Sequence, residues 1–163
     1  VFAAPYVNRW QAASDSADAA EIFEAETALG RAAESSVENK PQLDDAGQVP
    51  AENLAALKER LHTYNRELYE SGQINLKDPF SYETTGFDLT EYGLSQNIIG
   101  VLWIPRLNQR IPIYLGANAE NMAKGATLLG QTSMPLGETD SNTVIAAHRG
   151  FRGIPMFRDI QSI

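Results

Sequence analysis

The sequence of 163 residues contains no cysteine, and this absence limits what the chain can do alone. Without cysteine there is no disulfide framework, no thiolate metal site and no thiol nucleophile among these residues. Long hydrophobic runs are also missing. The longest, Ile98 to Ile104 with a glycine inside it, is far shorter than the roughly 20 residues that a membrane-spanning helix needs. We therefore expect no membrane-spanning segment within the chain.

Positive charge is scarce as well. Thirteen basic residues stand against 21 acidic ones, which gives a net charge of −8. Because an acidic chain repels phosphate backbones and anionic lipid headgroups, nucleic-acid binding and electrostatic membrane binding are disfavoured. The acidic pairs Asp44–Asp45 and Glu138–Asp140 lack the ligand pattern of a calcium loop. We predict neither a metal site nor a cofactor.

The first half of the chain has the periodicity of helices. The length and the 43% hydrophobic content of the whole chain suit one domain with an appendage. Apolar residues recur every three or four positions in the N-terminal stretch, at Trp10, Ala13, Ala17, Ala20 and Phe23. This spacing predicts a helix from Tyr6 to about Ser36, interrupted or ended near Gly30. Residues 40–50 collect proline, aspartate and glycine, which is typical of a connecting loop.

A second helix is predicted from Ala51 to Ser71. Its apolar stripe alternates by three and four residues and consists of Leu54, Leu57, Leu61, Tyr64 and Leu68. Glu52 lies in the first turn, where a negative charge is favourable, and Gly72 supplies a stop after the last turn.

After Phe80 the pattern changes to short β-type runs separated by proline and glycine. The predicted strands are residues 97–104, 110–115 and 143–148, with a short helix near residues 118–124. Residues 151–163 are predicted to form a turn and a short helix. The second half is therefore expected to be mainly β, as a barrel or a sandwich, and a barrel ending at Ile163 would leave an open edge.

The two histidines have different surroundings. His62 lies one position off the leucine stripe of its helix, so we interpret it as a solvated helix residue with no role. His148 follows an apolar run and precedes Arg149 and Gly150, so its ring is expected at the end of a rigid strand beside a flexible turn. An imidazole there can exchange a proton near neutral pH, or can serve as a hydrogen-bonded core residue. Both readings stay open on position alone.

Four motifs occur in order along the second half. They are GVLWIP at 100–105, IPIYLG at 111–116, GQTSMPLG at 130–137 and VIAAHRG at 144–150. Together they resemble successive landmarks of the sortase catalytic domain. The segment LKDPF at 76–80 resembles the Asp-Pro-aromatic lid of class C, pilin-polymerising sortases, and Tyr64–Asn65 also fits that class.

The resemblance implies a mainly β fold with an α-helical N-terminal segment, namely a sortase-type closed β-barrel that is incomplete in this chain. It implies a helical region over 1–75, a lid over 76–81 and the first part of the catalytic barrel over 82–163. Asp78, Pro79 and Phe80 would gate the substrate groove. A turn is the plainer interpretation of these three residues alone. Their place between helices and barrel favours the lid.

The resemblance also implies an activity. His148 would be the catalytic acid, and the nucleophilic cysteine and a catalytic arginine are expected beyond Ile163. Arg149 is interpreted as a structural or surface residue. The enzyme would cleave an LPxTG-type sorting signal after threonine and join pilin subunits through the amine of an acceptor lysine. It would work on the extracellular face of the Gram-positive cell membrane, with membrane contact only through anchor segments outside this chain.

Two alternatives remain. One is a catalytically dead, sortase-like binding module of the cell surface, which would lack the cysteine in its continuation. The other is a housekeeping sortase that anchors proteins to the cell wall, in which removal of the lid would have little effect.

Overall fold

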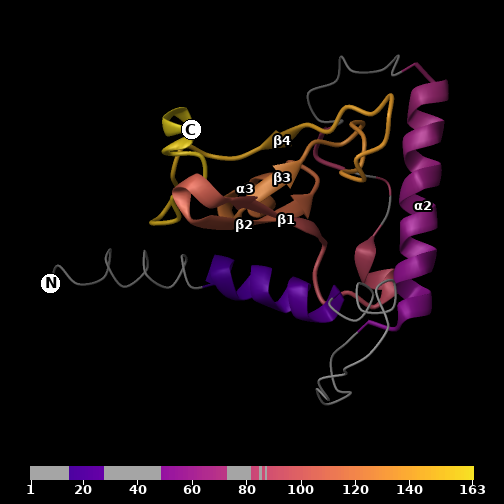
Figure 1. Cartoon of the computed structure of the whole chain (residues 1–163), viewed down its shortest axis with the longest axis horizontal. Helices are drawn as coiled ribbons and strands as arrows, with labels where there is room; N and C mark the ends of the chain where they lie inside the picture. The colour runs from indigo at the N-terminus through magenta and orange to yellow at the C-terminus, as the bar shows by residue number, and fades with distance from the viewer. Residues whose placement is uncertain (1–14, 28–48, 73–81, 85, 87) are drawn as a thin grey trace, which may run out of the picture.

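The computed structural model describes residues 15–27, 49–72, 82–84, 86 and 88–163. The predicted lid residues Asp78, Pro79 and Phe80 lie outside these ranges, as does most of the predicted N-terminal helix. Within them the chain forms two long helices, a sheet of four strands and a C-terminal segment of turns (Figure 1). The α2 helix stands at one end of the sheet, and the C-terminal segment lies at the other end.

The α2 helix spans Ala51–Glu70, so the predicted second helix is confirmed to within one residue. It buries Leu57, Leu61 and Asn65, which are spaced four residues apart and share one face. Gly72 follows the helix with φ of 68°, the left-handed conformation that glycine adopts without a Cβ penalty. The leucine stripe and the glycine stop together explain where this helix packs and where it ends.

Residues 15–27 form the other long helix. Its apolar side, Ala19 with Phe23, packs on Ile98 and Tyr114 of the sheet. Buried Glu26 fixes the end of this helix, because its Oε1 atom accepts a hydrogen bond of 3.1 Å from the backbone N–H of Ser95, which lies just before β1 of the sheet. The helix therefore lies along the β1–β2 side of the sheet (Figure 1).

The sheet has the strand order β1-β2-β3-β4. The strands are β1 (Ile98–Ile104), β2 (Gln109–Leu115), β3 (Ala126–Leu128) and β4 (Ile145–Ala146). β1 pairs antiparallel with β2, β2 pairs parallel with β3, and β3 pairs antiparallel with β4. The α3 helix (Ala119–Lys124) makes the crossover between the two parallel strands, and the side chain of Asn118 caps its first turn. The sheet does not close, which is consistent with an incomplete barrel.

Two details of the sheet differ from the sequence-based prediction. β3 was not predicted, because three residues are too few to show an alternating pattern. β4 covers only two residues of the predicted strand over 143–148. Just before β4, the carbonyl of Val144 accepts a hydrogen bond of 3.0 Å from the N–H of Leu129, and the N–H of Val144 donates one of 3.4 Å to the hydroxyl of Thr132.

One hydrophobic core joins α2 to the sheet. Its buried members are Val49, Leu57, Leu61, Leu89, Leu94, Ile104, Ile111, Ile113, Leu115, Ala126, Leu128 and Met134. Because helix and strand residues belong to the same cluster, α2 is part of the packed interior. Burial of such side chains contributes about 1.5–3 kcal/mol each.

The C-terminal segment is less regular than predicted. Phe151 and Ile154 form an isolated antiparallel bridge around a turn. The predicted short helix is a single 3-10 turn at Ile160–Ser162. This segment runs back past the end of β4, so it can hold the residues that follow that strand.

Candidate active site around His148

His148 lies two residues beyond the end of β4 and is half-buried. β4 is fixed to β3 through the pairs Thr127↔Ala146 and Leu128↔Ile145. Beyond the strand, the N–H of Phe157 donates a hydrogen bond of 3.1 Å to the carbonyl oxygen of His148. The backbone that carries the imidazole is therefore held on both sides, as expected for a residue at the end of a strand.

The His148 ring contacts one aromatic side chain. The ring of Phe151 stacks on it, with centroids 4.8 Å apart and planes 19° apart. Gly150, between the two, has φ of 92°, a conformation that turns the chain back and brings the rings together. Among the described residues, neither ring nitrogen has a hydrogen-bond partner. Within the described part of the chain, the imidazole is thus oriented by packing and not by hydrogen bonds to its nitrogens.

Three arginines surround this turn. The guanidinium of Arg149 donates a hydrogen bond of 3.1 Å to Gln161, that of Arg152 lies 5.1 Å from the centre of the Phe151 ring, and Arg158 pairs with Asp159. All three arginines are exposed. Arg149 is directed to the C-terminal 3-10 turn, a position that suits a surface residue. That interpretation of Arg149 stays a prediction.

A polar contact between α2 and the loop from β3 to β4 was not foreseen. Asn65 is 6% exposed and bonds both backbone groups of Met134: Nδ2 donates to the carbonyl at 3.2 Å, and Oδ1 accepts from the N–H at 2.6 Å. Asn65 Nδ2 and His62 Nδ1 also contact the carboxylate of Glu138. Figure 1 shows this loop lying against α2. His62, interpreted as solvated, is half-buried and paired.

The same contact changes the acidity of Glu138. The hydrogen bond from Asn65 is the main cause, and that from His62 adds to it; together they hold the pKa of the carboxyl below its ordinary value of 4.5. One signal of the contact is visible in the sequence: Asn65 continues the stripe of Leu57 and Leu61 at a spacing of four. A polar residue on a buried stripe needs a partner.

The loop held by Asn65 leads directly to β4. Ser133, next to Met134, donates its backbone N–H to the carbonyl of Asn142 at 3.0 Å, and its hydroxyl oxygen accepts from the Asn142 N–H at 3.0 Å. Asn142 lies three residues before the start of β4. A continuous set of short contacts therefore links α2 to the strand that carries His148.

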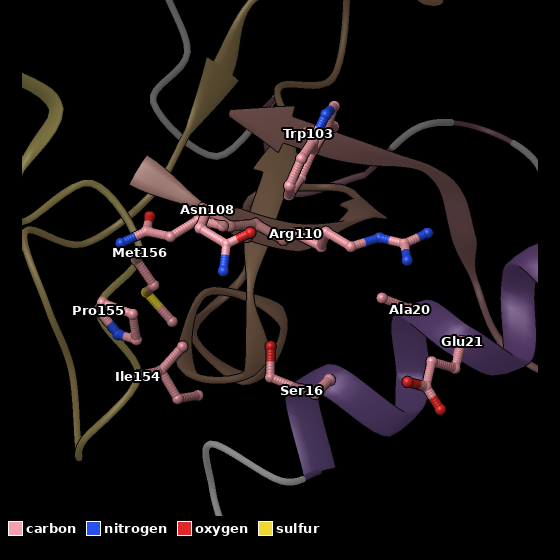
Figure 2. Close-up of a pocket in the computed structure, with 12 residues that line it drawn as sticks. Ser16, Ala20, Glu21, Trp103, Asn108, Arg110, Ile154, Pro155 and Met156 are labelled. Atoms are coloured by element: carbon pink, nitrogen blue, oxygen red, sulfur yellow. The ribbon is translucent and has the colours of Figure 1, made fainter. Parts of the chain in front are cut away.

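A separate pocket of about 490 Å³ lies between helix 15–27, the β1–β2 hairpin and residues 154–156. In Figure 2, Ser16 and Ala20 project from the helix toward the strand that carries Arg110. Trp103 is 48% exposed at its rim. His148 does not line this pocket, so the pocket is not the site of the chemistry expected at His148.

Neither a metal centre nor a membrane span is found in the described part of the chain. No group of three or more histidine, aspartate or glutamate side chains there could hold a metal ion. None of the helices in that part combines the length and the apolar character needed to cross a bilayer.

Residues 102–163 match the family model of the sortase domain. These residues belong to a sortase domain. They contain β2, β3, β4 and His148, so the candidate site lies within the sortase region. A search of curated proteins found no match.

Solved structures give a consistent result. A structure of Streptococcus agalactiae sortase C1 is 30% identical over 71% of this chain and 59% of that chain, with a TM-score of 0.60. A pilus-related sortase C of Group B Streptococcus is 26% identical over 70% and 58%, with a TM-score of 0.55. A lid mutant of the Streptococcus agalactiae enzyme is 25% identical over 71% and 56%, with a TM-score of 0.55. The predicted resemblance to class C sortases is confirmed.

The chain matches only part of each of these solved structures. The chain spans between 56% and 59% of the length of the three sortase structures. The sortase fold with its helical N-terminal segment is therefore supported, while the lid residues Asp78, Pro79 and Phe80 and the role of His148 stay predictions.

Proposed function

We propose that this chain is part of a class C sortase that polymerises pilins and that His148 is its catalytic acid. The observation that supports this most is the place of His148: a half-buried imidazole just beyond a strand of the sortase region, with no hydrogen-bond partner for its ring nitrogens among the described residues. Similarity to a pilus-related sortase C supports pilin subunits as the substrate class.

The chemistry needs a thiolate that this chain does not contain, so the proposal places the nucleophilic cysteine in sequence outside it. The thiolate attacks the threonine carbonyl carbon of an LPxTG-type signal, and the bond to the glycine nitrogen breaks. The His148 imidazolium gives its proton to the leaving amine. A lysine amine of the next pilin then attacks the thioacyl carbon and gives a proton to the His148 imidazole, which is neutral after the first step. The isopeptide bond forms, the thiolate is released and the imidazolium is restored.

The amine must win over water at the second step. A half-buried site in which the acyl group and the amine are held together favours this outcome, because positioning raises their effective concentration far above that in solution. We place the catalytic arginine that stabilises the tetrahedral intermediate in sequence outside this chain as well.

We propose residues 76–81 as a lid, with Asp78, Pro79 and Phe80 over the groove. A lid is also named for the Streptococcus agalactiae sortase C1 variant that this chain resembles. Pro79 restricts the backbone, Asp78 can pair with a guanidinium and Phe80 can cover a sulfur atom. The enzyme would act on the outer face of the Gram-positive cell membrane, held there by segments outside this chain.

The test uses the full-length protein encoded by the gene. Incubated with a pilin that carries an LPxTG-type signal and an acceptor lysine, it should form pilin multimers whose isopeptide bond is identified by mass spectrometry. His148→Ala should abolish multimers without unfolding the protein, while His62→Ala, the change at the other histidine, should retain them.

Other results would reject the proposal. Multimers at the wild-type rate in His148→Ala would remove that residue from the mechanism. Transfer to a peptidoglycan-type amine in place of lysine would indicate a housekeeping sortase. Absence of any cysteine in the full-length protein would leave only a sortase-like binding module.

A further inference from the structure

An aromatic contact, and no hydrogen bond among the described residues, orients the ring of His148. The Phe151 ring stacks on the imidazole at 4.8 Å with an angle of 19° between the planes. This geometry falls within the favourable range for offset-stacked aromatic pairs. Since both imidazole nitrogens are without partners in the described part of the chain, the stack is what restricts rotation of the ring.

Phe151 is itself held in place by a closed turn. Its N–H donates to the carbonyl of Ile154 at 3.0 Å, and the N–H of Ile154 donates back to the carbonyl of Phe151 at 2.9 Å. The two residues between them, Arg152 and Gly153, have φ of 46° and 97°, as a primed two-residue turn requires. Ile154 is 5% exposed and anchors the turn in the interior. The aromatic ring is therefore carried by a fixed turn.

The turn and the histidine are joined a second time through the backbone. Phe157, three residues after Ile154, donates its N–H to the His148 carbonyl. Phe157 thus fixes the His148 backbone, and Phe151 fixes the His148 ring. An imidazole held in this way keeps its plane constant, and no described residue occupies its nitrogens.

We propose that Phe151 is a positioning residue for His148: its ring fixes the plane of the imidazole so that a nitrogen faces the leaving amine. The destination of the proton rests on the proposed function, whereas the orientation of the ring does not. A freely rotating imidazole would adopt orientations that miss the amine. Loss of the stack should therefore lower kcat more than it changes KM.

The experiment compares three variants of the full-length protein. Phe151→Leu removes the aromatic face but keeps an apolar side chain, and Phe151→Tyr keeps the face. Tyr69→Leu is the matched control, because Tyr69 is 64% exposed on α2. We expect kcat of Phe151→Leu to fall about 3- to 10-fold with KM within about twofold, and Phe151→Tyr and the control to stay within about twofold of wild type.

Proton NMR of the His148 ring supplies the readout that a general packing role would not move. The ring current of a stacked Phe151 shifts the imidazole protons upfield. Phe151→Leu should move them toward the positions of a free imidazole, and Phe151→Tyr should keep them. The histidine signals are assigned by comparison with His148→Ala.

Three outcomes would overturn the proposal. One is an unchanged kcat and unchanged His148 shifts in Phe151→Leu. Another is a joint fall in kcat and thermal midpoint that Phe151→Tyr does not restore, since that indicates packing alone. The third applies if the wild-type protein forms no isopeptide product. The proposed function then fails, and the ring-proton shifts alone test the inference. Unmoved shifts in Phe151→Leu reject the positioning role, and moved shifts support it.

Discussion

Replacing Asn65 by alanine should destabilise the protein through the backbone of a residue 69 positions away. The Asn65 side chain bonds both the N–H and the carbonyl of Met134, which is 1% exposed. Removing it leaves the buried N–H of Met134 without a partner, which costs about 1–3 kcal/mol. The Met134 carbonyl loses one of two hydrogen bonds, because the N–H of Leu136 also donates to it at 2.8 Å, and a lost bond of this kind costs about 0.5–1.5 kcal/mol. The third contact, from Asn65 to the part-buried carboxylate of Glu138, is not counted in these costs. We expect the free energy of unfolding to fall by about 2–4 kcal/mol.

The measurement is urea unfolding of the full-length protein at pH 7, followed by circular dichroism. A loss of this size is a large part of the roughly 5–15 kcal/mol that stabilises a typical protein, and it should lower the midpoint with no change in the m value. In a thermal scan the midpoint should drop by roughly 4–15 °C. Among the described residues, the exposed neighbour Arg66 bonds only Thr63 of its own helix, so Arg66→Ala should change stability by less than about 0.5 kcal/mol.

A second variant separates the hydrogen bonds from the lost volume. Asn65→Asp keeps the shape of the side chain but lacks the donor to the Met134 carbonyl, and it places a second carboxylate beside Glu138. It should be at least as destabilised as Asn65→Ala at pH 7. If Asn65→Ala unfolds within about 0.5 kcal/mol of wild type, then water replaces these bonds at no cost and our account of how α2 docks is wrong.

Three further predictions concern acid stability, a glycine and the lid. The pKa of Glu138 is lowered in the folded state, so its contribution to the free energy of unfolding is present at neutral pH and is lost as pH falls below 4.5. In urea titrations at several acidic pH values, Glu138→Gln should therefore show a smaller change of stability with pH than wild type. Gly116→Ala should unfold at a lower urea concentration, because φ at this position is 82° and an added Cβ would lie 2.2 Å from a backbone oxygen. A Cβ added at Gly100 would have no neighbour within 4 Å, so the urea midpoint of Gly100→Ala should change much less. In the full-length enzyme, Asp78→Ala or Phe80→Ala should speed labelling of the cysteine by a thiol reagent, and unchanged labelling would count against a lid.

Much of the local structure could be predicted because its causes are local. The stripe of leucines and the glycine after it located α2 to within one residue, and the runs around Ile98–Ile104 and Gln109–Leu115 located β1 and β2. β3 was missed because it is three residues long and is recognisable only by its pairing with β2 and β4. Its parallel pairing with β2 also depends on the α3 crossover.

The sequence by itself determined the helix Ala51–Glu70, the β-rich second half and the place of His148 after an apolar run, because periodicity and glycine positions act over a few residues. The tertiary structure alone decided what surrounds that histidine. Docking of α2 on the loop before β4 joins Asn65 to Met134, and the turn after Gly150 brings Phe151 onto the imidazole. The first contact depends on how segments far apart in the sequence meet in space, and the second on the backbone angles of the turn at Gly150. The spacing of apolar residues encodes neither.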